Sequence, residues 1–379
     1  MKTGNKIKKS ILILSDINID SGFGKEYVVY NFAKELSTEY NVSLFESNIG
    51  EKKNNFNEEL SSLGVKIFFF NNLLGSILPY TFDSILTLFG LLKGSDAVYL
   101  AESDLFTDIL MIVFRKFLKF KVFRGYHNPL EYNLLPDGRV ISKYSLRRLY
   151  YKLILKIEKN FDGIHVENSD QKKILHQMGY GKVVLIHPYV LKNIPTTPIT
   201  KYDDFSIIFL GRLNYHKGSD LIPSIIDSIL NAGVIVNIYI AGDGILSNQI
   251  KEFCSRHDNC KFLGFISTKE KENYLSKCHI LVAPTRVEAF MITGIEAMSL
   301  GTPVISFPVP GPNDYIINGE NGFIVNGVTE LSDKVEEIYS DFTSDRYSRY
   351  IENCINTAKE YTLDAGSGKY LELMNELLF

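Results

Sequence analysis

The chain has 379 residues, a formal net charge of −3 at pH 7 and a hydrophobic fraction of 45%. This length predicts at least two domains with ample cores, and we expect no nucleic-acid partner. No run of about 18 uninterrupted apolar residues occurs, so we expect no transmembrane helix. The apolar run at residues 11–14 is stopped by Asp16. This is typical of a first buried strand and not of a secretion signal, so we expect a cytoplasmic protein.

Short apolar runs alternate with amphipathic helical stretches in the first half of the chain, which predicts a parallel sheet covered on both faces. A polar, proline-containing segment at 191–204 shows no periodicity and is predicted to be a linker. The alternation then restarts. We therefore predict an α/β protein with two Rossmann-like, doubly wound domains at 1–192 and 203–345 and a cleft between them. Further helices are expected at 346–379.

A glycine-containing loop follows the first predicted strand. Gly22 and Gly24 lie just before a predicted helix that starts near Lys25. Glycines at such a place let a ligand approach the backbone N–H groups of the helix start. The third glycine of a dinucleotide fingerprint is missing, so a plain tight turn is an equally good interpretation.

Two stretches of the first half, at 109–124 and 143–159, combine basic with apolar side chains. Residues 1–192 carry 26 basic and 20 acidic residues, whereas the remainder carries 15 and 24. A basic helix with apolar and aromatic side chains can lie on an anionic membrane surface. The alternative interpretation is a solvated face above a stripe of core residues. The sequence leaves both open.

Three further positions are candidates for a ligand site. His127 follows a predicted strand, at the sheet edge where parallel sheets bind their ligands, although a structural role is the alternative. Arg212 and Lys217 lie on a turn between a later strand and helix. Arginine offers a planar fork and lysine a mobile point charge to phosphate oxygens. This turn therefore predicts a phosphate site.

The stretch 284–306 contains two carboxylates, Glu288 and Glu296, close to a predicted helix start. The turn between them includes Phe290, Met291, Ile292 and Thr293. Free N–H groups at a helix start favour an anion. Carboxylates beside them suit the hydroxyls of a ligand whose phosphates occupy the helix end. This combination is typical of a nucleotide-sugar site.

The four cysteines show no metal-ligand spacing, and no acidic cluster demands a metal. They are Cys254, Cys260, Cys278 and Cys354. We expect reduced thiols and neither a bound metal nor a cofactor.

These motifs resemble the signatures of the retaining glycosyltransferases of family 4. One signature is FLGRLNYHKGSDLI at 209–222, and the other is the glutamate pair whose second member begins EAMSLGTPVIS. The resemblance implies the GT-B fold, with the last helices crossing back to the first domain. In the family the first glutamate meets sugar hydroxyls and the second meets the ribose, which implies these roles for Glu288 and Glu296. An arginine and a lysine hold the diphosphate, here Arg212 and Lys217.

The resemblance implies roles for other positions. A family histidine near the C6 hydroxyl of the sugar corresponds to His127. The glycine-rich loop near the donor phosphate and the acceptor corresponds to Gly22 and Gly24. The segment that lays its backbone against the base corresponds to Phe265 and Ile266.

One position departs from the family pattern, because Met291 stands where family members usually have glycine. Glycine lets backbone N–H groups approach the sugar and the phosphate. Methionine at this place implies an unusual donor, a shifted loop or a weakened enzyme.

The function that the resemblance implies is a retaining, metal-independent glycosyltransferase. It would move a hexose or N-acetylhexosamine from a nucleotide-diphosphate sugar, with a UDP-sugar favoured, to a lipid-linked or polysaccharide acceptor in cell-surface glycan synthesis. Docking on the inner face of the cell membrane would accompany this. Two alternatives stay open: a nucleotide-sugar epimerase of the same fold, which the Arg212–Lys217 spacing disfavours, and a non-catalytic partner protein that binds nucleotide sugars, which Met291 keeps open.

Overall fold

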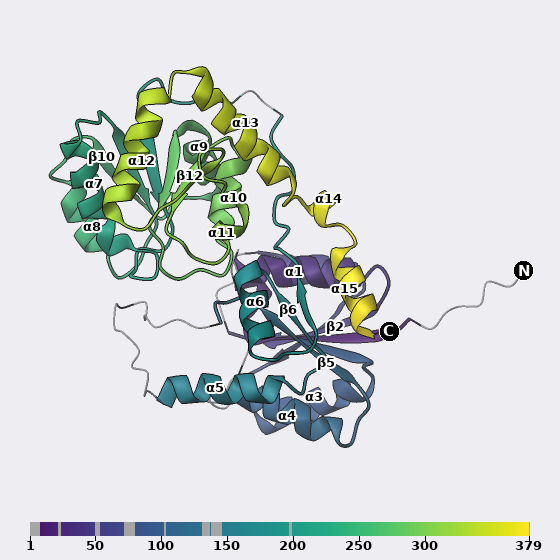
Figure 1. Ribbon diagram of the computed structural model, residues 1–379. Coiled ribbons are helices and arrows are strands. Elements are labelled where there is room, and N and C mark those ends of the chain that lie inside the picture. The colour runs from purple at the N-terminus through teal and green to yellow at the C-terminus, as the bar shows by residue number, and fades with distance from the viewer. Residues whose placement is uncertain are drawn as a thin grey trace, which may run out of the picture. The chain divides into compact units, whose positions relative to one another are not determined.

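The computed structural model describes residues 8–21, 24–49, 54–71, 80–101, 104–130, 137, 146–196 and 199–378. The chain forms two compact units (Figure 1). The N-terminal unit takes in the chain up to Asn128, the segment that ends at His187, and the last residues from Gly366 on. The C-terminal unit contains Pro188–Ala365. The C-terminal end of the chain is therefore part of the first unit.

The described part of the N-terminal unit contains a sheet of seven parallel strands in the order β3-β2-β1-β4-β5-β6-β7. The strands are β1 (Ser10–Ser15), β2 (Asn41–Ser47), β3 (Lys66–Phe70), β4 (Ala97–Leu100), β5 (Lys121–Tyr126), β6 (Gly163–Val166) and β7 (Val183–Leu185). The strands β1 and β4 are almost wholly buried, as expected for central strands with helices on both faces.

Helices cover both faces of this sheet, with α1 and α15 on one face and α3 and α4 on the other (Figure 1). The helical elements are η1 (Ile19–Ser21), α1 (Lys25–Leu36), α2 (Phe56–Ser62), α3 (Phe82–Lys93), α4 (Leu105–Arg115), α5 (Leu146–Glu158), α6 (Ser169–Gln177) and α15 (Lys369–Leu378). Asp104 caps α4, because its carboxylate accepts the N–H of Thr107 at 2.7 Å. Glu35 of α1 accepts the N–H groups of Tyr370 and Leu371, which fixes α15 on α1.

The described part of the C-terminal unit contains a second parallel sheet, of six strands, in the order β10-β9-β8-β11-β12-β13. The strands are β8 (Ser206–Leu210), β9 (Asn237–Ala241), β10 (Cys260–Gly264), β11 (Ile280–Ala283), β12 (Val304–Ser306) and β13 (Gly322–Ile324). The helical elements are η2 (Ser219–Leu221), α7 (Ile222–Asn231), α8 (Ser247–Cys254), α9 (Thr268–Lys277), α10 (Ile292–Ser299), α11 (Pro312–Tyr315), α12 (Val328–Asp341), α13 (Asp345–Lys359) and α14 (Leu363–Gly366), which ends at the boundary between the units. The predicted α/β class with two parallel sheets is confirmed.

The order of the second sheet decides where its loops meet. The strands β8 and β11 are neighbours, with Ile208 opposite Leu281, although about 70 residues separate them in the chain. Apolar residues of β8 and α7, among them Ile207 and Ile226, pack in one buried core. The carboxyl ends of β8 and β11 therefore lie side by side at one edge of the sheet, where the loops that follow them carry the predicted motifs.

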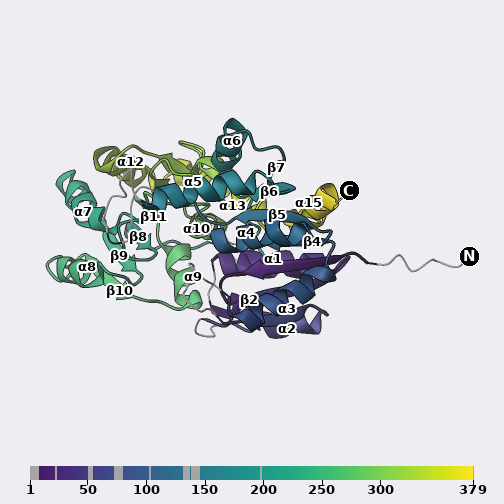
Figure 2. The same ribbon diagram turned by 90° about the horizontal axis from the view of Figure 1, so that it is seen from below.

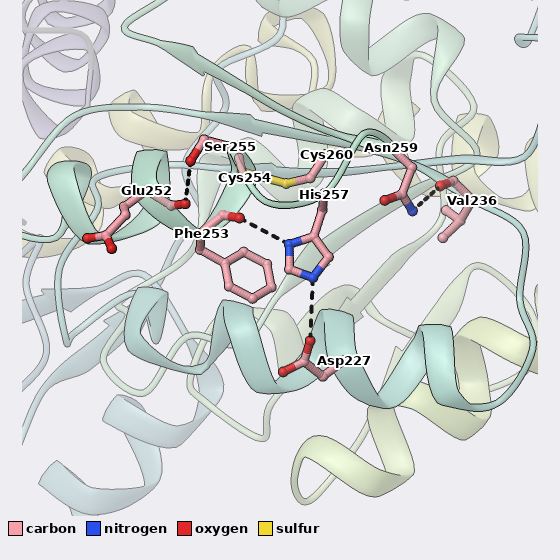
Figure 3. Close-up of a disulfide and its surroundings, with 9 residues drawn as sticks. All are labelled: Asp227, Val236, Glu252, Phe253, Cys254, Ser255, His257, Asn259 and Cys260. Atoms are coloured by element: carbon pink, nitrogen blue, oxygen red, sulfur yellow. Dashed lines mark hydrogen bonds and ion pairs between the residues drawn. A yellow bond between two sulfur atoms is a disulfide. The ribbon is translucent and has the colours of Figure 1, made fainter.

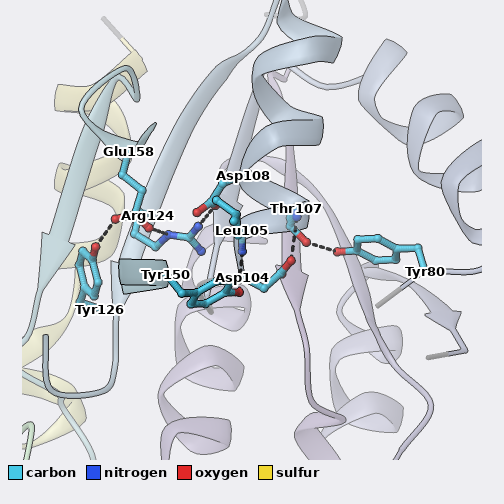
Figure 4. Close-up of polar contacts among 9 residues, drawn as sticks. All are labelled: Tyr80, Asp104, Leu105, Thr107, Asp108, Arg124, Tyr126, Tyr150 and Glu158. Atoms are coloured by element: carbon cyan, nitrogen blue, oxygen red, sulfur yellow. Dashed lines mark hydrogen bonds and ion pairs between the residues drawn. The ribbon is translucent and has the colours of Figure 1, made fainter. Parts of the chain in front are cut away.

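A buried group of charged side chains joins three elements of the N-terminal unit (Figure 4). Arg124 on β5 donates from Nε to Glu158 of α5 at 2.7 Å and pairs through Nη2 with Asp108 of α4. All three side chains are 0% exposed. Tyr126 also donates to Glu158. Desolvation raises the pKa of both Asp108 and Glu158. One guanidinium thus holds both α4 and α5 on β5.

The cysteines differ from the expectation of reduced thiols. Cys254 and Cys260 are joined by a disulfide (Figure 3), whereas Cys278 and Cys354 are free and buried. The first cysteine ends α8 and the second begins β10. The turn between them, in which the backbone N–H of His257 donates to the carbonyl of Cys254 at 3.0 Å, brings their Cα atoms to 5.0 Å. A spacing of six residues does not reveal this approach without the turn.

None of the helices in the described ranges is long and apolar enough to cross a membrane.

Candidate functional site

One pocket lies at the carboxyl ends of β8 and β11. The loop after β8 contributes Arg212 and Lys217, and the loop after β11 contributes Glu288 and Met291 to its lining. Thr293, in the first turn of α10, also lines it. Five residues that the sequence singled out in two separate motifs therefore meet in one place within the C-terminal unit, next to the N-terminus of a helix.

Backbone contacts hold the two loops together. The carbonyl of His216 accepts the N–H of Arg286 at 2.8 Å and that of Val287 at 3.2 Å. Gly218 adopts φ +67°, and a Cβ atom there would clash with the carbonyl of Pro284. Glycine is therefore required at position 218 both by the left-handed conformation and by the close approach of the second loop.

The ammonium of Lys217 forms an ion pair with the carboxylate of Glu288. The two side chains are 29% and 11% exposed, so the pair stands at the wall of the pocket and not in the core. Arg212 is exposed, and its guanidinium makes no ion pair or hydrogen bond with any residue of the described ranges. The pocket thus has one engaged cation, one available cation and one carboxylate. The sequence predicted these residues but not the pairing of Lys217 with Glu288.

Glu296 does not line this pocket. Its carboxylate accepts from Nζ of Lys271 on α9 at 2.6 Å, and the two side chains are 27% and 25% exposed. Sequence reasoning missed Lys271, because it lies 25 positions earlier on another helix. The only available signal was a lysine in the exposed, charge-rich helix before β11.

Met291 has a left-handed backbone, with φ 62° and ψ 67°, at the N-cap of α10. No other non-glycine residue of the described ranges has a positive φ. Its carbonyl accepts from the hydroxyl of Tyr315 at 3.1 Å and from the N–H of Gly294 at 3.0 Å. The backbone thus takes a conformation that glycine adopts readily. The buried side chain lines the pocket, where glycine would leave it open.

The neighbours of Met291 divide between the core and the site. Phe290 is buried, with its ring 5.6 Å from that of Tyr315 and 5.4 Å from that of Tyr361. Ile292 is half-buried and begins α10. Neither side chain lines the pocket. Phe290 therefore supports the turn from behind.

Phe265 and Ile266 follow β10 and also lie outside the pocket lining. The ring of Phe265 is 81% exposed, and Ile266 is half-buried. The carbonyl of Gly264 accepts the N–H of Gly242 at 2.8 Å, which joins this segment to the turn after β9. An exposed aromatic ring at a strand end is available for contact with a ligand.

His127 lies in the N-terminal unit, just after β5, and is buried. Its Nδ1 is 2.6 Å from Oε1 of Glu167, and its Nε2 is 3.1 Å from the hydroxyl of Tyr99. The same hydroxyl is 2.8 Å from Nδ1 of His165, whose Nε2 is 3.1 Å from the carbonyl of Ile186. Both ring nitrogens of His127 are therefore engaged.

The donor and acceptor properties of these side chains fix the direction of the hydrogen bonds that link His127, Tyr99 and His165. A carbonyl only accepts, so His165 donates to Ile186 from Nε2 and accepts from the Tyr99 hydroxyl at Nδ1. The Tyr99 oxygen then accepts from Nε2–H of His127. Burial lowers the pKa of His165 to about 3, which agrees with a neutral ring at that position.

Of the predicted glycine pair, Gly22 lies outside the described residues. Gly24 immediately precedes α1, and its N–H donates to Oε2 of Glu26 at 3.1 Å.

Residues 196–357 match the family model described as "Glycosyl transferases group 1". The chain is 29% identical over 145 residues to the capsular polysaccharide biosynthesis glycosyltransferase CapM of Staphylococcus aureus, covering 37% of this chain and 38% of that protein. It is 28% identical over 144 residues to the 2-deoxystreptamine N-acetyl-D-glucosaminyltransferase of Niallia circulans, covering 37% and 36%. The matches thus span well under half of the length of these relatives.

Solved structures resemble the whole chain. A crystal structure of Anabaena Alr3699/HepE in complex with UDP and glucose has a TM-score of 0.72 at 15% identity, covering 96% of this chain and 99% of that one. The pneumococcal O-GlcNAc transferase GtfA in complex with UDP and GlcNAc has a TM-score of 0.72 at 14% identity, covering 98% and 100%. At such identities the likeness shows the fold, and the predicted GT-B fold is confirmed.

Proposed function

We propose that the protein is a retaining, metal-independent glycosyltransferase, because residues 196–357 match the model of the glycosyl transferases group 1 family. It transfers a hexose or N-acetylhexosamine from a nucleotide-diphosphate sugar, with a UDP-sugar favoured, to a lipid-linked or polysaccharide acceptor of the cell surface. The observation that carries the proposal is the meeting of Arg212, Lys217 and Glu288 in one pocket beside the N-terminus of α10. The names of relatives that act on N-acetylglucosamine or in capsule synthesis support this choice of substrates.

The leaving group of such a reaction is a nucleoside diphosphate, whose negative charge grows as the glycosidic bond breaks. The free guanidinium of Arg212 provides a planar fork for it, and Lys217 provides a second positive charge. The N–H groups at the start of α10 add a positive dipole end. These groups stabilise charge where it develops, which lowers the barrier to bond breaking without a metal.

The ammonium of Lys217 is paired with the carboxylate of Glu288. The diphosphate then replaces Glu288 as the partner of Lys217. The carboxylate of Glu288, whose side chain is 11% exposed, becomes available to accept hydrogen bonds from sugar hydroxyls. The carboxylate of Glu296 releases the ammonium of Lys271 and accepts hydrogen bonds from the ribose hydroxyls instead. Attack from the leaving-group face retains the anomeric configuration, and the departing phosphate serves as the base.

The other predicted positions complete the proposal. The resemblance assigns His127 to the C6 hydroxyl of the sugar, and a hydroxyl there would have to displace Tyr99 or Glu167, since both ring nitrogens are engaged. The resemblance assigns Gly24 to the donor phosphate and the acceptor, and it gives the same assignment to Gly22, which lies outside the described residues. We assign the segment of Phe265 and Ile266 to the base, and the backbone of the turn of Phe290, Met291, Ile292 and Thr293 to the donor.

A donor panel tests this function. The protein is incubated with UDP-, GDP- and ADP-linked hexoses and N-acetylhexosamines, before and after treatment with a chelator, and products are followed by NMR. We expect slow, chelator-resistant hydrolysis of one donor with retained anomeric configuration. Interconversion of sugars without hydrolysis would instead show an epimerase. Binding without turnover for every donor and supplied acceptor would show a non-catalytic partner protein.

We also propose that the N-terminal unit docks on an anionic membrane. Helices α4 and α5 are neighbours (Figure 2), and the ring of Phe89 on α3 lies 5.3 Å from that of Phe114 on α4. The three helices and the turn after α4 expose the apolar side chains of Phe82, Leu86, Ile109, Val113, Phe117, Leu149 and Leu153. Lys116, Lys119, Lys152 and Lys156 are exposed among them. Each basic side chain near an anionic surface contributes about 1 kcal/mol, which salt weakens.

Flotation with liposomes that contain phosphatidylserine tests this docking. We expect binding at low salt that Phe117→Glu reduces at least several-fold, because this ring is 75% exposed. The matched control is Ile235→Glu, which alters an equally exposed apolar residue of the C-terminal unit, 80% exposed, and leaves binding unchanged. Absence of flotation at low salt would contradict the proposal.

A further inference from the structure

A second charged pair, outside the pocket lining, connects the two loops of the site. Nη1 and Nη2 of Arg286 lie 2.6 and 2.8 Å from Oδ1 and Oδ2 of Asp220, which makes a parallel, two-bond fork. Nη1 also donates to the carbonyl of Tyr215 at 2.9 Å. The hydrogen bond to Asp220 is the main cause that raises the pKa of Arg286. The guanidinium is therefore committed to the first loop through three contacts.

Both residues of this fork are close in sequence to residues that line the pocket. Asp220 lies three residues after Lys217, and Arg286 lies two residues before Glu288. The fork therefore joins the segment that carries the phosphate-binding cation to the segment that carries the carboxylate. Neither Asp220 nor Arg286 lines the pocket.

We propose that Asp220 and Arg286 are positioning residues, which set the placement of Lys217 relative to Glu288 for a bound diphosphate. This inference rests on the proposed function of the pocket. The planar guanidinium matters because a two-bond fork fixes orientation as well as distance, and a lysine at the same place would supply only a point charge.

The fork is not needed to keep the loops in contact. His216 already accepts two backbone N–H groups of the second loop, and Gly218 packs directly on Pro284. The side chains of Arg286 and Asp220 are 31% and 22% exposed, and ion pairs of such exposure contribute little to stability. A misplacement of reacting groups by about 1 Å costs on the order of 100-fold in rate. Loss of the fork should consequently affect turnover far more than folding.

A double-mutant cycle of Asp220→Asn, Arg286→Lys and the double variant tests the proposal. Donor hydrolysis, the Kd for uridine diphosphate and the melting temperature are measured for each. We expect each single variant to lower kcat by about 10- to 100-fold and to weaken binding of uridine diphosphate, with a melting temperature within about 4 °C of the original. The double variant should be no worse than the more impaired single one, because both act through the same fork.

Arg346→Lys is the matched control. Arg346 pairs with Glu337 at 2.6 Å and with Asp341 at 2.7 Å in the same unit but does not line the pocket, so its replacement should leave kcat unchanged. The proposal is overturned if the single variants retain kcat and nucleotide affinity within twofold, or if their effects multiply in the double variant. Failure of the original protein to hydrolyse any donor, with fork-dependent binding of uridine diphosphate intact, would reject the transferase and keep the positioning role. No binding of uridine, guanosine or adenosine diphosphate would reject both.

Discussion

The two units each contain a group of opposite charges, and the two groups differ in burial. Around Arg124 in the N-terminal unit, all three charged side chains are inaccessible to solvent. The pair of Lys217 and Glu288 in the C-terminal unit stands at a pocket wall, 29% and 11% exposed. A buried charge that loses its partner stays desolvated, whereas a charge at a pocket wall can take water or a ligand instead. The group around Arg124 is therefore suited to a permanent connection between elements. The pair of Lys217 and Glu288 is suited to an exchange of partners.

The largest effect should follow from breaking the buried group. Arg124→Met leaves the carboxylates of Asp108 and Glu158 without their guanidinium, and we expect a loss of about 3–5 kcal/mol in the free energy of unfolding, measured with denaturant. A triple variant, Asp108→Leu with Arg124→Met and Glu158→Met, should recover most of this loss, because it removes the unpaired charges as well. A single variant as stable as the original would refute the permanent connection.

Breaking the pocket pair should change activity instead of stability. We expect Lys217→Ala to lower donor turnover by about 100- to 1,000-fold, because a cation aimed at the developing charge is lost. Its free energy of unfolding should change by about 1 kcal/mol or less, as for other partly exposed ion pairs. Lys271→Ala is the matched control, since Lys271 pairs with Glu296 outside the pocket lining. We expect the Lys271→Ala variant to retain more activity than Lys217→Ala. Near-original turnover in Lys217→Ala would contradict the proposed site.

A buried histidine offers a third case beside the buried and the exposed charge pairs, because burial keeps its ring neutral. Burial lowers the pKa of His279 to about 4, and its Nδ1 accepts the N–H of Ser206 at 3.1 Å. The unfolded chain binds the proton near pH 6.5, so stability is fully present above that value and is lost as the pH falls toward 4. Between pH 6.5 and pH 4, the free energy of unfolding should fall by up to about 1.4 kcal/mol per pH unit because of this histidine.

The measurement compares the pH dependence of unfolding in the original protein and in His279→Asn. Asparagine keeps an acceptor for Ser206 but takes no proton, so the slope between pH 6.5 and pH 4 should flatten. Parallel slopes for the two proteins would show that this histidine does not contribute to acid sensitivity.

The smallest effect concerns the backbone of the pocket. Met291→Gly should be more stable than Met291→Ala by about 1 kcal/mol, although both lose the same buried thioether, because only glycine accepts φ 62° without strain. Thermal unfolding of the two variants measures this difference. An alanine variant of equal or greater stability would mean that the turn relaxes out of the left-handed region. The donor panel, repeated with Met291→Gly, would show whether the side chain restricts the sugar.

Much of the site could be predicted from the sequence. The alternation of apolar runs predicts two parallel sheets, and parallel sheets collect the loops that follow their strands at one edge. Arg212, Lys217 and Glu288 follow apolar runs, and the structure places all three in one pocket. The prediction of reduced thiols was wrong for Cys254 and Cys260, because the turn that brings them together has no signal in cysteine spacing alone.

The sequence by itself determined the α/β class and the residue types that follow each strand, because these depend on local periodicity and on residue chemistry. Tertiary structure alone decided the partners: Lys217 with Glu288, Lys271 with Glu296, and the Asp220–Arg286 fork. It also decided that Met291 takes a left-handed backbone. For Lys217 with Glu288 and for the Asp220–Arg286 fork, the physical reason is strand order. β8 and β11 are neighbours although helices and two other strands separate them in the chain, so side chains about 70 positions apart come within hydrogen-bonding distance.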